Sequence, residues 1–85
     1  MKQIQETPTH LIYLDYFEGQ QVRIFKNKLT GEVGFNTDDV AKILGYRNET
    51  AMLNDPKVND VLKQSYSETG KMPLMKIDDY NNNLN

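Results

Sequence analysis

Apolar residues alternate with polar ones in the first half of the chain, a pattern that predicts β-strands. Residues 21–26 place Val22 and Ile24 on one side of the backbone, so we expect a strand with one buried face. The apolar run at residues 11–17 is short and rich in branched and aromatic side chains, and we interpret it as another strand. A turn at Glu18-Gly19 separates the two segments.

A third strand is expected at residues 32–36, where Val33 and Phe35 face the same way. The intervening residues 27–31, with the sequence NKLTG, are typical of a turn. The segments on either side of this turn should therefore pair as an antiparallel hairpin.

The pattern changes to helical spacing in residues 37–54, TDDVAKILGYRNETAMLN. Val40 and Leu44 would lie on the buried face of a first helix, and the small Ala41 would let a second helix cross closely. Gly45 can take the positive φ that a tight turn needs, and a short second helix should follow. This is the layout of a helix-turn-helix core.

Polar residues mark the expected helix ends. Asn36 or Thr37 can cap the first helix, whose first turn carries Asp38 and Asp39, where the helix dipole favours negative charge. Asn48 can cap the second helix, which we place at residues 49–54.

A third helix is predicted to begin at Asp55-Pro56, with the aspartate as cap and the proline at the first helical position. It should run to about Tyr66, and its apolar residues at helical spacing are Val58, Val61 and Leu62. Residues 74–77 are interpreted as a last strand.

These elements together predict a small α+β domain, in which an antiparallel β-hairpin or sheet is followed by a helix-turn-helix-like layer of three helices. The domain is expected to span residues 10–78. Residues 1–9 are polar and contain Pro8, and we interpret them as a flexible leader. Residues 79–85 are polar and rich in asparagine, and we interpret them as a tail that is either disordered or truncated.

Composition narrows the possible functions. The chain has 85 residues, a formal net charge of −2 and no cysteine, which excludes disulfides and thiolate metal sites. With a single histidine the usual zinc ligand sets are missing, so we expect no metal and no cofactor. The N-terminus lacks a signal-like apolar run, and no segment approaches the length of a membrane span. We therefore expect a cytoplasmic protein that does not associate with membranes.

Two strings in the middle of the chain resemble the N-terminal domain of the Bro family (Bro-N), which occurs in phage antirepressors and baculovirus repeated-ORF proteins. The first string is similar to F-x-G-x-x-V-R, and the matching residues are Phe17, Gly19, Val22 and Arg23. The second is similar to D-V-A-x-x-L-G-Y-x-N, and the matching residues are Asp39, Val40, Ala41, Leu44, Gly45, Tyr46 and Asn48. The resemblance covers roughly residues 16–54. It implies a DNA-binding domain of a phage or prophage transcription regulator, of a kind usually joined to a separate C-terminal domain.

A double-stranded DNA interface can be drawn from residue chemistry. Arg47 and Asn48 lie at the N-terminal end of the second helix, where arginine can bond guanine and asparagine can bond adenine in the major groove. Thr50 and Asn54 would continue the same side of that helix. The basic residues predicted to contact phosphates are Arg23, Lys26 and Lys28 from the hairpin and Lys57 from the start of the third helix.

Several of these residues also have a structural interpretation. The basic residues of the hairpin could form its solvated face, because edge strands and turns commonly carry lysine. Asn48 could be only a helix cap. Tyr46 is expected to pack on the core with its hydroxyl at the surface rather than to stack on a base.

No pattern in the sequence indicates an enzyme. The chain lacks a nucleophile elbow, a phosphate-binding glycine loop and a metal-ligand cluster, and His10, which we expect at the surface, has no nucleophile to pair with. The alternative to DNA binding is a protein-protein interaction or dimerisation module that has kept the fold, which suits the acidic net charge. A contiguous positive face joining Arg23, Lys26, Lys28 and Arg47 would favour DNA, and scattered charges would favour a protein partner.

Overall fold

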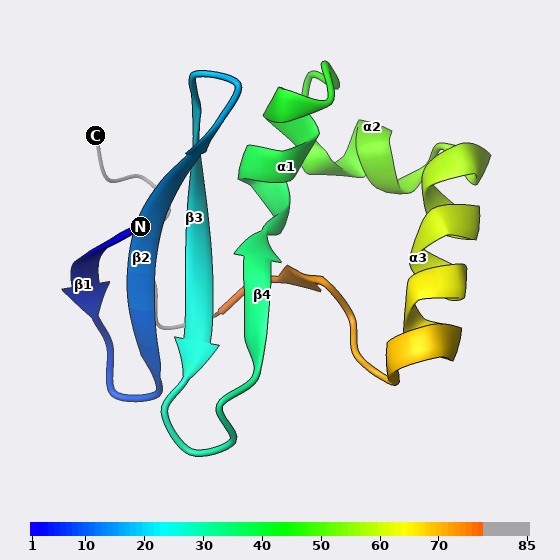
Figure 1. Ribbon diagram of the computed structural model, residues 1–85. Helices are drawn as coiled ribbons and strands as arrows, with labels where there is room; N and C mark the ends of the chain where they lie inside the picture. The colour runs from blue at the N-terminus through cyan, green and yellow to red at the C-terminus, as the bar shows by residue number, and fades with distance from the viewer. Residues whose placement is uncertain (78–85) are drawn as a thin grey trace.

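The computed structural model describes residues 1–77, in which a five-stranded sheet stands beside three helices (Figure 1). The elements in chain order are β1 (Lys2–Glu6), β2 (His10–Phe17), β3 (Gln20–Asn27), β4 (Val33–Asn36), α1 (Thr37–Ile43), α2 (Glu49–Leu53), α3 (Pro56–Thr69) and β5 (Leu74–Met75). The strands lie in the sheet in the order of the sequence. Strands β1 to β4 are antiparallel, and β5 joins β4 in parallel. The predicted α+β class is confirmed.

The predicted antiparallel pairing of β3 and β4 is confirmed. β2 and β3 also form a hairpin, which closes through a two-residue turn. Phe17 pairs with Gln20, and between them Glu18 and Gly19 take φ angles of 50° and 81°. Two successive positive φ angles are typical of the type I′ turn, whose twist matches that of the strands it joins. This turn fixes the register along all eight paired positions of the two strands.

The prediction of a flexible leader at residues 1–9 is wrong, because Lys2–Glu6 forms β1 and pairs with β2. β1 is an edge strand, and Ile4, its single aliphatic side chain, is 44% exposed. An edge strand that buries so little apolar surface has no alternating pattern from which it could be predicted. The predicted tail, residues 79–85, and residue 78 of the predicted domain lie outside the described residues.

The core lies on both faces of β3. Ile12 and Phe25 are fully buried and pack with Ile77 on one face. Val22 and Ile24 point to the opposite face and are also buried. The expectation of a single buried face for this strand is therefore too narrow, because β3 is the central strand of the sheet.

β4 turns its larger side chains outward. Val33 and Phe35 share a face, as expected, but they are 51% and 43% exposed. The buried position between them is Gly34, where an added Cβ would lie only 2.7 Å from the Cβ of Met75. The absence of a side chain at Gly34 thus lets β5 approach β4 closely.

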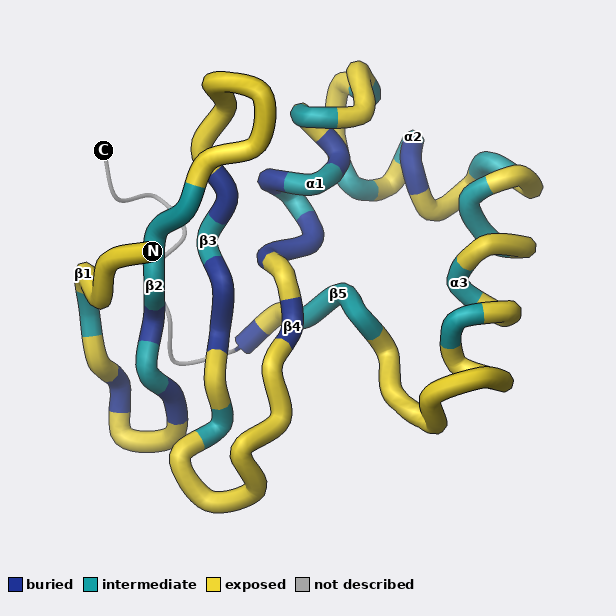
Figure 2. The backbone as a smooth tube through the Cα atoms, in the orientation of Figure 1, coloured by how far each residue is buried: buried dark blue, intermediate teal, exposed yellow. Residues whose placement is uncertain are grey.

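The helices lie beyond the β4 side of the sheet (Figure 1). α1 and α2 occupy the expected residues, whereas α3 continues past Tyr66 to Thr69 and is capped by Gly70 at a φ of 72°. None of the 14 residues of α3 is buried, as the exposed and half-buried colours along it show (Figure 2). His10 also differs from expectation, because it is 9% exposed and its ring lies edge-on to Phe25.

Candidate nucleic-acid interface

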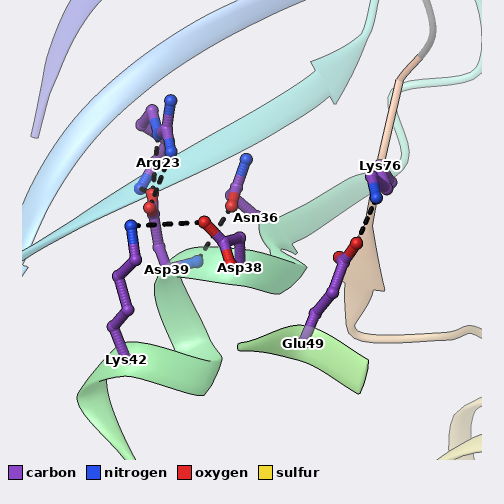
Figure 3. A network of polar contacts seen from close by, with 7 residues as sticks. All are labelled: Arg23, Asn36, Asp38, Asp39, Lys42, Glu49 and Lys76. Atoms are coloured by element: carbon purple, nitrogen blue, oxygen red, sulfur yellow. Dashed lines mark hydrogen bonds and ion pairs between the residues drawn. The ribbon is translucent and has the colours of Figure 1, made fainter. Parts of the chain in front are cut away.

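α1 begins directly after β4, and Asn36 caps it. The side-chain oxygen of Asn36 accepts a hydrogen bond of 2.9 Å from the backbone N–H of Asp39 (Figure 3). Asp38, in the first helical turn, forms an ion pair of 3.3 Å with Lys42 on the solvent side of the helix. Of the two predicted caps, Asn36 is therefore the one that the structure uses.

The carboxylate of Asp39 binds Arg23 across the junction of sheet and helix (Figure 3). The guanidinium donates from Nε to Oδ2 and from Nη2 to Oδ1, both at 2.7 Å, and the backbone N–H of Arg23 donates to Oδ2 at 2.9 Å. The pairing of β3 with β4 covers only residues 24–26, so this carboxylate bonds a backbone donor beyond the paired segment. The two side chains are 14% and 11% exposed. Arg23 thus ties β3 to α1 and presents little of its charge to solvent.

Gly45 ends the first helix with the predicted positive φ, which is 87°. Its N–H donates to the carbonyl of Lys42 at 3.1 Å, and the N–H of Tyr46 donates to the carbonyl of Ala41 at 2.9 Å. These two bonds form a Schellman motif, in which the residue after the helix takes the left-handed conformation that glycine adopts without strain. The motif sets the direction in which the chain leaves α1.

A hydrogen bond joins Tyr46, which precedes α2, to Asp55, which follows it. The tyrosine hydroxyl donates to Oδ2 of Asp55 at 2.5 Å, while Oδ1 accepts the backbone N–H of Lys57 at 2.9 Å and caps α3. The hydrogen bond from Tyr46, followed by that from the Lys57 backbone, lowers the pKa of Asp55, and the same bond to Asp55 raises the pKa of Tyr46. The hydroxyl of Tyr46 therefore joins the segment before α2 to the segment after it.

α2 is held at its first residues by two polar contacts. The side-chain oxygen of Asn48 accepts the N–H of Ala51 at 2.8 Å, so this asparagine is a helix cap. Glu49 forms an ion pair with Lys76, whose pKa is raised by this hydrogen bond (Figure 3). On its inner side the helix buries Met52 completely. These contacts fix the helix against both the core and the segment after β5.

Five of the predicted DNA-binding residues lie in or beside α2 and are exposed: Arg47, Asn48, Thr50, Asn54 and Lys57. Arg47 precedes the helix, Asn54 ends it, and Lys57 lies in the first turn of α3. Neither Arg47 nor Lys57 forms an ion pair with any residue in 1–77. The two charges therefore lie on either side of α2 and are open to solvent.

The remaining hairpin lysines lie elsewhere. Lys26 pairs with Val33 near the far end of β3, and Lys28 follows in the next turn, where it forms an ion pair with Glu6. This end of the sheet points away from the connection between α1 and α2 (Figure 1). Arg23, Lys26, Lys28 and Arg47 therefore do not form a contiguous positive face.

Two carboxylate roles were missed by reasoning from the sequence. The dipole of α1 was expected to stabilise the charge of Asp39, yet this carboxylate binds Arg23, 16 residues earlier in the sequence. Asp55 was expected as a cap and is one, but its bond to Tyr46 was not foreseen. No periodicity links residues that meet only after the chain has folded, so the local pattern held no signal for either contact.

No family model, curated protein or solved structure matches this chain. Within residues 1–77, no three histidine, cysteine or acidic side chains gather in a way that could hold a metal ion. The helices of this described part are too short or too polar to cross a membrane.

Proposed function

We propose that the protein is a non-catalytic DNA-binding domain of a phage- or mobile-element-type transcriptional regulator, similar to an antirepressor. The observation that carries the proposal is the exposed surface around α2, which we call the α2 surface: Arg47, Thr50, Asn54 and Lys57. Its two cations lack ion pairs within the described residues, so phosphate binding would not have to break an existing contact.

The resemblance to the Bro N-terminal domain supports the same proposal. Its two strings supply the contacts that position this surface, because Arg23 of the first string binds Asp39 of the second. Gly45 and Tyr46, also in the second string, form the turn that carries Arg47 outward. These contacts give the two strings a structural reason to occur in one chain.

The geometry revises which residues would contact DNA. The side-chain oxygen of Asn48 is engaged by the backbone N–H of Ala51, so this side chain is less free to turn toward N6 and N7 of an adenine while it caps α2. Asn54 becomes the asparagine that is better placed for adenine, and Arg47 can bond guanine or phosphate. Lys57 would contact phosphate. Arg23 and Lys28 are no longer proposed to contact DNA, because each forms an ion pair within the protein.

Binding to a mixed-sequence duplex, measured at several salt concentrations, tests the proposal. Each phosphate contact adds about 0.9 to the slope of log K against log salt, so Arg47→Ala with Lys57→Ala should weaken binding and lower the slope by about 2. Lys26→Ala with Lys28→Ala is the matched control, because it removes the same charge from the far end of the sheet. Equal effects of the two double variants, or no binding at low salt, would refute the proposal.

A second candidate function is protein interaction. Two observations favour it: the hairpin lysines and Arg47 are scattered, and α3 leaves apolar side chains uncovered next to α2. The α2 surface is polar and the uncovered region is mostly apolar, and the two meet at Thr50, which also lines the hollow between α2 and α3.

A further inference from the structure

An apolar groove runs between α2, α3 and the segment before β5. It consists of two hollows of about 440 and 510 Å³, which share Leu53, Leu62 and Met72 in their walls. We call this feature the α2–α3 groove. Leu74 extends it toward the sheet and Tyr66 toward the end of α3.

The apolar lining of the groove is partly exposed. Leu53, in α2, is 38% exposed, and Met72, two residues before β5, is 46% exposed. Adjoining apolar side chains that remain in water forgo the free energy of burial and commonly mark a binding surface. Methionine suits such a surface because its unbranched side chain adapts to different partners.

α3 itself requires an apolar contact. It has 14 residues and buries none of them, and a helix of this length is marginal in water without tertiary packing. Along α3, Leu62 and Tyr66 are spaced four positions apart and line the groove, whereas Val61 points elsewhere and is 65% exposed. A segment seated in the groove would cover the inner stripe of α3 and stabilise the helix.

The charges on the groove define what can occupy it. Its charged lining residues are Glu49, Lys63 and Lys76, and the first and last of these form an ion pair. Lys63 has no ion pair within residues 1–77 and leaves one positive charge beside an apolar surface. Nucleic acid does not fit, because most of the lining offers nothing to a phosphate.

We propose that the α2–α3 groove binds an amphipathic helical segment of a partner protein, with an apolar stripe that faces Leu53, Leu62 and Met72 and a carboxylate that faces Lys63. This inference does not rest on DNA binding, since none of its anchor residues belongs to the α2 surface.

Selection from a displayed library of random helical peptides of about 16 residues tests the inference. Enriched peptides should carry apolar residues at i, i+3 or i+4, and i+7, together with aspartate or glutamate at the edge of the stripe. Against these peptides Leu62→Glu should weaken binding by about tenfold or more. The control Val61→Glu, an equal charge on the adjacent exposed position of α3, should leave binding unchanged.

Lys63→Glu gives an independent test, because Lys63 is exposed and forms no ion pair within residues 1–77, so its replacement removes no contact that supports the fold. The variant should enrich basic rather than acidic peptides from the same library. The inference is overturned if no peptide is enriched, if selected peptides bind the Leu62→Glu and native proteins equally, or if Lys63→Glu leaves the preference for acidic residues intact. Self-association that depends on Leu62 would assign the groove to a second copy and also overturn it.

Discussion

Asp39→Ala tests the contact that joins the sheet to the helices. The substitution removes two carboxylate oxygens that accept hydrogen bonds from the guanidinium and the backbone N–H of Arg23. It deletes a negative charge beside a cation that is only 14% exposed. Removing one member of a buried ion pair costs about 3–5 kcal/mol, because the remaining charge is desolvated and uncompensated.

Asp38→Ala is the matched control, since it deletes a carboxylate one residue away in the same helical turn. Its partner Lys42 is 63% exposed and the ion pair spans a single turn of the helix. An exposed pair of this kind contributes less than about 1 kcal/mol. The two variants should therefore differ by at least about 2 kcal/mol in the free energy of unfolding.

Urea unfolding followed by far-ultraviolet circular dichroism measures this difference. A small domain has a total stability on the order of 5–10 kcal/mol, so Asp39→Ala should shift the midpoint strongly or leave a fraction of the protein unfolded. In thermal unfolding, each kcal/mol corresponds to about 4–8 °C for a domain of this size. If Asp39→Ala is no more destabilising than Asp38→Ala, the ion pair does not hold the junction as described.

Two further predictions concern the turn before α2. Gly45→Val should cost about 1–3 kcal/mol in urea unfolding, because a β-branched residue resists a φ of 87°; unaltered stability would contradict the role of the turn. The pKa of Asp55 is lowered, so its contribution to stability is present above pH 3.8 and is lost as the pH falls through the folded pKa. The pKa of Tyr46 is raised, so its contribution is present below pH 10.0 and is lost as the pH rises through the folded pKa. Tyr46→Phe should therefore flatten both the acid and the alkaline limbs of a plot of Tm against pH, and identical limbs in the two proteins would refute the bond.

Local patterns predicted most of the fold. The alternation around Val22 and Ile24 located β3, and the cap signals of Asn48 and Asp55-Pro56 located α2 and α3, because these features depend on neighbouring residues. The end of α3 was placed too early, at about Tyr66, because the helix continues to Thr69 and ends at Gly70 in a left-handed conformation. Sequence patterns located the helix caps but not the polar edge strand β1, because a cap forms with the backbone of its own helix.

Features that depend on long-range contacts could not be predicted. β1 forms because β2 offers it an edge. A last strand was predicted at residues 74–77, but its parallel pairing with β4 was not, because that pairing depends on the room that Gly34 leaves for Met75. Neither condition is visible in a single segment. For the candidate site the same limit applies, because the sequence shows that Arg23 is basic but not that Asp39 binds it.

DNA binding through the α2 surface can be tested by backbone amide NMR during titration with a mixed-sequence DNA duplex, first at low and then at higher salt. We expect salt-sensitive shifts at residues 46–57, around the α2 surface, and small shifts at the turn that carries Lys28. The absence of shifts at low salt, or shifts centred on the turn between β3 and β4, would contradict DNA binding through the α2 surface.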